Sequence, residues 1–402
     1  MNIKYWFLSK KNSLKTGLAL SFFTFSMLLN CLSIVILNYF GQKKFVHLGF
    51  LEVFKDLPIA FFAAFISRYI PRVGHLNSIV IALATACILC IVTPFVDDFW
   101  FFKIWFLLIG LGFILVKVSV LYITINLSKA EEKGSRFMQF IEAAFMAGIV
   151  VVNLIFGLIM GSSSPYLWKY GFWAIAFFSL LTIACLLYGR AIWDNISAGF
   201  MNSGQDVAPN SWNVMKKSFI FLLIIFFIII TEQSFTTWLP TYSKAIFNAG
   251  PLLATQTTVI FAFAALTGRI LYGFLIIKRS WSRLFTGLLV FILVIVCTLS
   301  IVLIAETPHP LLLYLIPCVG FFIGPLYPII NAHHLYSITQ EQERSTLLGL
   351  IIVFSSLASC TSSVVIGLAL DHIPPEYAFT LLFLPILAML SLFIKYRHKP
   401  IA

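Results

Sequence analysis

The sequence predicts an all-α integral membrane protein with 12 transmembrane helices in two pseudo-symmetric six-helix bundles. Its 402 residues are 60% hydrophobic and only 10% charged, whereas soluble domains are about 45–50% apolar and about 25% charged. The mean hydropathy of +0.99 points the same way. The apolar residues form long unbroken runs, which are typical of membrane-spanning helices and not of the alternating strands of a barrel.

The runs define where each helix is expected. A helix needs roughly 20 apolar residues to cross a bilayer. The spans are expected at residues 16–40, 46–67, 76–96, 101–127, 136–160, 168–189, 217–240, 251–277, 283–304, 310–335, 346–370 and 376–394.

The basic residues set the expected orientation. With a cytoplasmic N-terminus, 19 of the 27 Lys and Arg residues fall in cytoplasmic segments and 5 in outer ones. This positive-inside bias supports an even number of spans, with both termini cytoplasmic, in the inner (plasma) membrane of a bacterium. The basic N-terminal stretch resembles the start of a signal peptide. The apolar run behind it is too long and lacks a small-residue cleavage site, so we interpret it as an uncleaved first helix.

A polar connection divides the chain in the middle. We expect an N-terminal six-helix bundle over residues 1–190, a cytoplasmic linker over 191–216 and a C-terminal bundle over 217–402. Two six-helix halves in one chain are the layout of alternating-access transporters.

Composition also excludes several classes of function. The net charge of +12 lies in short loops between spans, which indicates membrane topology and argues against a nucleic-acid partner. All seven cysteines fall in apolar runs, so no disulfide framework, metal site or cofactor is expected. No metalloprotease or nucleophile-elbow motif is present, and nothing else suggests an enzyme.

Charged residues inside spans are the main functional signal, because each costs about 2.5–3.5 kcal/mol to insert. Glu52, Lys55 and Asp56 share one face of the second span. Lys55 is expected near the midplane, at roughly 15 Å from the outer end. These three residues either form a substrate or proton site or neutralise one another as a structural cluster.

Three further charged residues lie deep in later spans. Lys117 has no acid within one turn, and it can meet Glu142 of the next span, for which Arg136 and Lys133 are alternative partners. Glu232 is expected in the outer half of span seven as a coupling acid or ligand contact. Trp238 follows it, either as a ligand contact or in an interfacial aromatic belt. Polar side chains expected in the cavity wall include Tyr122 and Asn126.

Two basic turns at equivalent places carry a resemblance to a known family. Arg68, Arg72 and Gly74 follow span two, with Ser67 at the position of the family's acid. In span eight the corresponding residues are Gly268, Arg269 and Gly273. With the two-half layout, these turns resemble those of the major facilitator superfamily, and the resemblance implies that these residues act as gates.

Two further stretches are similar to sugar and fucose-type permeases of that family. They are residues 231–242 in span seven and residues 320–328 in span ten. Fucose-type permeases also carry acids in spans one and four, whereas this chain has no acid in span one and Lys117 in span four. The Gly-Pro signature of drug antiporters in span five is missing.

The sequence therefore predicts a secondary active transporter. The two lysines within the first half favour a small organic anion such as a carboxylate, sugar acid, amino acid or siderophore. The buried acids favour proton coupling. The alternatives are a neutral sugar symporter, a drug or metabolite exporter, and, from other classes, a channel, a non-transporting receptor or a membrane-embedded enzyme. The expected partners are a small-molecule substrate, the proton and the lipid bilayer, and we expect a monomer.

Overall fold

We describe the protein from a computed structural model, which covers residues 9–39, 45–96, 99–128, 131–160, 165–201, 211–249, 251–275, 280–305, 309–338 and 340–397. The chain is helical over these ranges, which contain no strand. The helices are α2 (Lys10–Tyr39), α3 (Phe45–Val73), α4 (His75–Val92), η1 (Thr93–Phe95), α5 (Phe99–Leu127), α6 (Glu131–Met160), η2 (Pro165–Tyr170), α7 (Gly171–Met201), α8 (Ser211–Lys217), α9 (Phe219–Phe247), α10 (Pro251–Leu275), α11 (Trp281–Ala305), α12 (Leu312–Leu315), η3 (Ile316–Val319), α13 (Gly320–Ile323), α14 (Leu326–Ser337), α15 (Glu341–His372), α16 (Pro375–Thr380) and α17 (Phe383–Arg397).

Within the described residues, 11 segments are long and apolar enough to cross a membrane. The chain is therefore an integral, multi-pass membrane protein. The predicted span 46–67 corresponds to α3, which is 29 residues long. This helix is not among the 11 segments. It is the helix that carries Glu52, Lys55 and Asp56.

Helices cover both ends of the predicted linker, residues 191–216. We predicted the end of the sixth span at residue 189, but α7 continues to Met201. The short helix α8 occupies Ser211–Lys217. Backbone hydrogen bonding extends past the apolar run here, since hydropathy marks the part of a helix within lipid and not the end of the helix.

The predicted span 310–335 is broken into α12, η3, α13 and α14. Pro317 lies within η3, and Pro325 precedes α14. A proline has no N–H group to donate to the carbonyl four residues earlier, so it interrupts an α-helix. The interruption frees carbonyl oxygens inside the protein, and one of them is part of the site described below.

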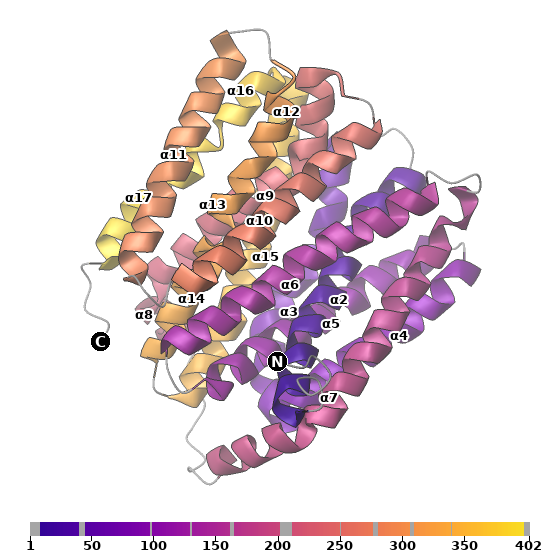
Figure 1. The fold of residues 1–402 in the computed structure, drawn as a ribbon, viewed down its shortest axis with the longest axis vertical. Coiled ribbons are helices and arrows are strands. Elements are labelled where there is room, and N and C mark those ends of the chain that lie inside the picture. The colour runs from indigo at the N-terminus through magenta and orange to yellow at the C-terminus, as the bar shows by residue number, and fades with distance from the viewer. Residues whose placement is uncertain are drawn as a thin grey trace.

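Helices from the two ends of the chain gather on opposite sides of the molecule. Figure 1 shows the indigo-to-magenta helices α2 to α7 on one side and the orange-to-yellow helices α10 to α17 on the other. Helices α6 and α10 run side by side between them, and α3 packs along α15. We call the end of the molecule that carries the end of α7, helix α8 and the start of α9 the linker side.

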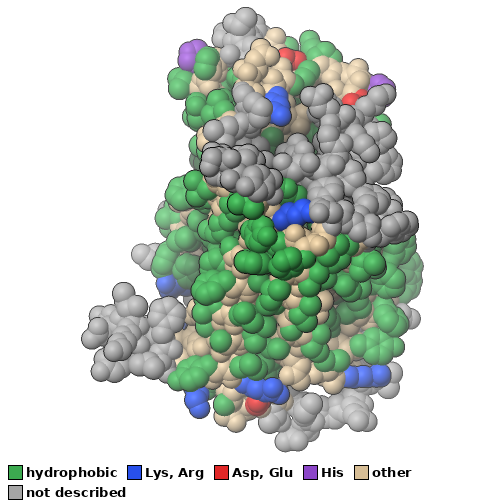
Figure 2. Space-filling model, turned by 90° about the vertical axis from the view of Figure 1, so that its right-hand side faces the viewer, with side chains coloured by type: hydrophobic (Ala, Val, Ile, Leu, Met, Phe, Trp, Pro, Cys, Tyr) green, Lys and Arg blue, Asp and Glu red, His purple; other side chains and the backbone are tan. Residues whose placement is uncertain are grey.

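The surface fits a lipid environment. Figure 2 shows a face covered mainly by hydrophobic side chains, with Lys and Arg side chains gathered along its lower edge. The exposed apolar residues include Phe61, Phe65, Phe177, Phe263 and Phe291. Apolar surface on this scale is stable when lipid chains cover it.

Candidate functional site

Arg269 of α10 lies at the centre of a buried ionic cluster. Its side chain is only 2% exposed. The Nη2 atom donates to Glu232 Oε1 of α9 at 2.8 Å. The Nη1 atom donates at 2.8 Å to the backbone carbonyl of Glu142 in α6. The Nε atom donates at 2.9 Å to the carbonyl of Gly324. These three bonds join α10 to α9, α6 and the break between α13 and α14.

The sequence around the break explains why Arg269 binds there. Pro328 cannot donate to the Gly324 carbonyl, so that oxygen stays available to the guanidinium. Pro325 likewise leaves the Phe321 carbonyl without its helical donor. Gly268 packs so closely on this carbonyl that a Cβ atom would overlap it. The glycines and prolines therefore build the anchor for Arg269.

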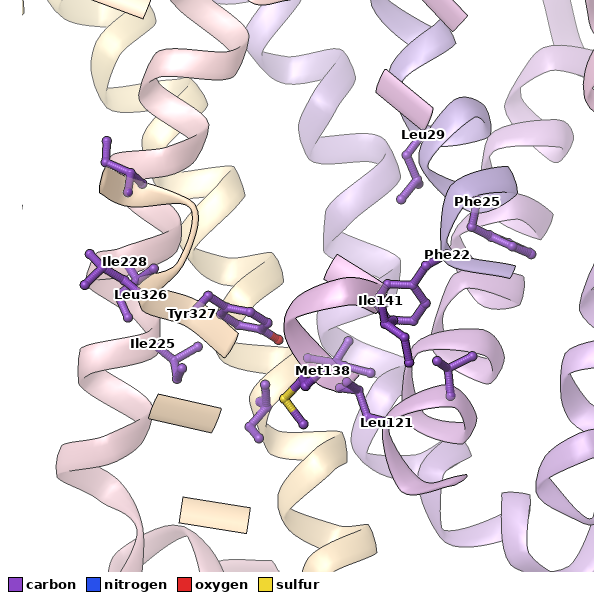
Figure 3. Packing of buried hydrophobic residues seen from close by; sticks show 14 of the residues in the cluster. Phe22, Phe25, Leu29, Leu121, Met138, Ile141, Ile225, Ile228, Leu326 and Tyr327 are labelled. Carbon is purple, nitrogen blue, oxygen red and sulfur yellow. The ribbon is translucent and has the colours of Figure 1, made fainter. Parts of the chain in front are cut away.

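Lys117 of α5 lies close to this cluster but has a different environment. Its side chain is 8% exposed. The Nζ atom lies 5.4 Å from the ring centroid of Phe113 and 5.1 Å from that of Tyr327 in α14. Figure 3 shows Tyr327 pointing from α14 toward Met138 and Ile141 of α6. Among the described residues, no carboxylate oxygen forms an ion pair with Lys117, although Glu142 and Glu232 lie within electrostatic range. Two aromatic rings thus hold a buried ammonium group by cation–π contacts.

Glu142 is held more loosely than Glu232. Its Oε2 atom lies 4.0 Å from Arg269 Nη1. Its Oε1 atom is buried and has no hydrogen-bond partner among the residues that the structure describes. The ion pair of Glu142 is with Arg269, whereas the guanidinium of Arg136, its predicted alternative partner, lies over the Phe274 ring at 4.4 Å. Residues 117, 142, 232 and 269 thus form what we call the central cluster, with two cations and two carboxylates.

Asp56 of α3 has a partner in the other half of the chain. The Ser359 hydroxyl of α15 donates to Asp56 Oδ2 at 2.6 Å, and both residues are buried. The bond joins α3 to α15 near the middle of both helices. The side chains of Glu52 and Lys55 lie outside the described residues, so the predicted shared face of this cluster stays a prediction.

Replacing Ser359 with alanine is expected to destabilise the contact between α3 and α15. Asp56 would lose a charge-assisted hydrogen bond, which is typically worth about 1.5–3 kcal/mol. The free energy of unfolding in mixed detergent micelles measures the loss. Ser391→Ala is the matched control, because that hydroxyl bonds the Ala388 carbonyl of its own helix at an exposed position. Equal stability of the two variants would contradict this role.

Tyr122 and Asn126 have contacts at the linker side. The Tyr122 ring stacks on His75 of α4 at 3.8 Å, with Trp193 of α7 at the edge. Asn126 Oδ1 accepts a bond from Arg344 Nη1 of α15 at 3.3 Å. Both residues lie one to three turns beyond Lys117 along α5. The structure therefore places these two predicted cavity residues where helix ends meet.

Tyr336 makes a second contact across the linker side. Its hydroxyl donates to the carbonyls of Ile125 at 3.3 Å and Ser128 at 3.4 Å, at the end of α5. It reaches them by passing over Gly134 of α6, where any Cβ atom would overlap the tyrosine ring. Residues from α14 and α15 thus bind the ends of α5 and α6 on this side.

The predicted gate residues have varied environments. Gly74, with φ 91, is the single residue that joins α3 to α4, in a conformation that favours glycine. Arg72 is exposed and lies 5.3 Å from the ring of Tyr69 in its own helix. The Arg68 side chain lies outside the described residues. Gly273 lets α10 approach Gln139 of α6, to which a Cβ atom would lie at 3.2 Å.

Trp238 is 2% exposed, so the alternative that places it in an aromatic belt facing lipid is wrong. It is packed in the core among α9 residues such as Phe235 and Tyr242. Its burial follows from helical spacing, because Phe235, Trp238 and Tyr242 lie three and four residues apart and share one buried face of α9.

The sequence prediction missed the pairing of Arg269 with Glu232. Arg269 lies six residues from the end of α10, or about 9 Å from the linker side. Glu232 lies thirteen residues into α9, at about 20 Å. The long guanidinium side chain covers most of this difference in depth. The available signal was the presence of opposite charges in two consecutive spans. The structure also adds Tyr327. Gln139, a polar residue of α6 that the sequence already suggests for the cavity wall, donates from Nε2 to the Pro325 carbonyl at 3.2 Å.

Comparisons with solved structures show the same fold in two transporters. The proton:xylose symporter XylE, bound to 6-bromo-6-deoxy-D-glucose, is 14% identical with a TM-score of 0.75, covering 99% of this chain and 96% of that chain. FucP, a Major Facilitator Superfamily transporter in the outward conformation, is also 14% identical, with a TM-score of 0.65 and coverage of 95% and 98%.

Sequence comparison gives the family directly. No curated protein sequence is matched by this chain. Residues 14–363 match the model of the Major Facilitator Superfamily, which is most of the chain and includes the whole central cluster. The eleven apolar spans, the shared fold and this match agree, and the chain belongs to the Major Facilitator Superfamily of membrane transporters.

Proposed function

We propose that the chain is a secondary active transporter that moves a small polar organic anion by alternating access, coupled to protons. The observation that carries the anion is the buried ammonium of Lys117, which two aromatic rings hold and no described carboxylate pairs at close range. A cation without a close counter-ion in a low-dielectric site attracts a carboxylate strongly. Arg269 is already engaged by the protein, because three of its five N–H groups donate to protein oxygens, so Lys117 is the cation more open to a substrate.

Alternating access is supported by the position of the central cluster. Lys117 and Glu142 come from the first half of the chain, and Glu232 and Arg269 come from the second half. Arg269 donates to both halves, so it links them at the place where a substrate would contact both. Contacts of Tyr336 and Arg344 with α5 close the linker side in this conformation.

We also propose twelve spans, with α3 as the twelfth, and cytoplasmic termini in a bacterial inner membrane. The proposed units are residues 1–190 and 217–402 joined by 191–216. A repeated feature supports the two units. His75, Tyr122 and Trp193 meet at the linker side of the first. Trp281, His333 and Tyr396 meet in the corresponding helices of the second.

A neutral sugar symporter is the second candidate. The observation that favours it is the fold shared with XylE, whose title describes a proton:xylose symporter, and with FucP. In that case the carboxylates would bind sugar hydroxyls and Lys117 would neutralise Glu142. The two candidates differ in whether Lys117 contacts the solute.

Replacing Lys117 with glutamine is expected to weaken anion binding by at least tenfold, because the anion loses a buried charge partner worth about 2–5 kcal/mol. We would measure thermal stabilisation of the purified protein by D-glucuronate, L-lactate, D-xylose and L-fucose. The wild type should respond to at least one anion. Lys216→Gln on the exposed helix α8 is the matched control. Stabilisation by the neutral sugars alone would overturn the anion proposal and favour the sugar symporter.

A further inference from the structure

Arg269 forms a hydrogen bond with only one of the two carboxylates of the central cluster. Glu232 receives a direct hydrogen bond at 2.8 Å from Nη2. The Glu142 Oε2 atom lies 4.0 Å from Nη1, too far for a hydrogen bond, whereas the backbone carbonyl of Glu142 accepts a bond from that nitrogen at 2.8 Å. Three hydrogen bonds therefore hold Arg269, and none of them involves the Glu142 side chain.

One oxygen of the Glu142 carboxylate is available to bind a proton. Its Oε1 atom is buried without a hydrogen-bond partner among the described residues. An ionised carboxylate can only accept hydrogen bonds, so burying one of its oxygens without a donor is costly. A protonated carboxylic acid is neutral, so its burial costs less. The geometry thus suits a side chain that alternates between the two forms.

The charged groups around Glu142 come from several helices. Arg269 of α10, Lys117 of α5 and Glu232 of α9 lie within electrostatic range of it. From α14, Tyr327 lies against Lys117. From α2, Lys15 lies over Phe137, about 7.5 Å along α6 from Glu142.

The other neighbours of α6 place their charges elsewhere. Lys169 lies in η2, which packs against the far end of α6, and it donates to the Val96 carbonyl. At the end of α7, Arg190 pairs with Asp194. Glu142 is thus surrounded by two cations and one carboxylate that is already paired.

We propose that Glu142 carries the coupled proton and that its protonation charges the central cluster to accept a monoanion at Lys117. This inference rests on the proposed function, which it deepens. With both carboxylates ionised, the two cations and two carboxylates cancel. With Glu142 protonated the cluster carries one positive charge, and a bound monoanion restores neutrality. Neutrality matters because a net charge in a water-poor site is expensive.

The step itself is a proton transfer. A proton from the aqueous phase on the loading side forms an O–H bond at Glu142 Oε1, and no electrons change hands. The anion then binds, and the neutral pair crosses when the halves rearrange. The O–H bond breaks to water on the other side after the anion has left. One proton and one negative charge move together, so the cycle transfers no net charge.

Infrared spectroscopy tests the proton carrier without any substrate. A protonated carboxylic acid has a C=O stretching band that an ionised one lacks. We expect a pH-titrating band in the wild type that Glu142→Gln removes and that Glu376→Gln, in the short helix α16, and Asp56→Asn retain. The Gln variant should fold, since the backbone carbonyl that holds Arg269 is unchanged. A band that survives in Glu142→Gln, or that Asp56→Asn abolishes, would overturn the assignment.

Binding tests the coupling. With D-glucuronate as probe, linkage of one proton to one anion weakens wild-type binding about tenfold per pH unit once Glu142 is ionised. Glu142→Gln imitates the protonated form, so its affinity should stay high and lose this pH dependence. The same pH dependence in the variant would refute the proposal.

These experiments distinguish failure of the proposed anion transport from failure of the assignment of the proton to Glu142. If no anion binds the wild type, the proposed anion function fails, while the infrared result still decides which carboxylate holds the proton. If anions bind and Lys117→Gln abolishes binding, but Glu142→Gln changes neither the band nor the pH dependence, the proposed function stands and this inference is wrong.

Discussion

Replacing Arg269 with methionine is expected to cost about 3–5 kcal/mol of stability, the typical loss when one partner of a buried ion pair is removed. Glu232 would lose its only described ion-pair partner, the Gly324 carbonyl would lose its donor, and the Glu142 carbonyl would lose a second donor besides its helical one. Because the guanidinium is only 2% exposed, water does not reach this site to replace the lost hydrogen bonds. The free energy of unfolding in mixed detergent micelles measures the effect.

A second variant separates charge from packing. Glu232→Gln in the Arg269→Met background removes the uncompensated carboxylate and should recover a substantial part of the loss. Arg190→Met is the control. Its ion pair with Asp194 at 3.4 Å is exposed, so the change should cost less than about 1 kcal/mol. A small effect of Arg269→Met, or no recovery in the double variant, would show that the cluster does not hold the helices together.

Replacing Gly134 with alanine is expected to open the linker side. The added methyl group would occupy the space of the Tyr336 ring, which would have to leave. Its single O–H, shared between the carbonyls of Ile125 and Ser128, would lose both acceptors, at about 1 kcal/mol. Overlap in a close-packed contact adds about 1–3 kcal/mol. The population should therefore shift away from the closed linker side by roughly tenfold or more.

Hydrogen–deuterium exchange measures this shift on the unlabelled protein. Peptides that cover the end of α5 and the start of α15 should exchange faster in Gly134→Ala. Gly157→Ala in the same helix is the control, because nothing lies within 4 Å of its Cβ position. Unchanged exchange at the linker side in a folded Gly134→Ala protein would mean that Tyr336 does not hold the linker side closed.

Much of the fold was predictable because the lipid bilayer places one strict constraint on the backbone. Every backbone group in the bilayer must bond internally, so apolar runs of sufficient length become helices. The twelve expected runs correspond to helical segments within the described residues. The ends of the helices are less well predicted, as in α7, which extends to Met201 and not to residue 189. The break before α14 has local signals in the sequence, namely Gly324 and Pro325.

The site was less predictable, because its members come from distant parts of the chain. Lys117, Glu142 and Glu232 stood out, since any charge in an apolar run does. Tyr327 did not stand out, because an aromatic residue in a membrane span is ordinary. The sequence predicts Tyr122 and Asn126 in a cavity wall, but one or more helical turns separate them from Lys117.

By itself the sequence determined that this protein is a helical bundle in a membrane with rare buried charges, because composition and spacing are local properties. Only the tertiary structure decided how those charges divide. Arg269 takes Glu232 as its partner and the main chain of Glu142 as its support, while Lys117 rests on aromatic rings. The division depends on the side-chain reach and the depth of helices far apart in the chain, and on one carbonyl that Pro328 leaves free. Pairing in a low-dielectric interior is decided by distances of a few ångströms, which the order of residues does not specify.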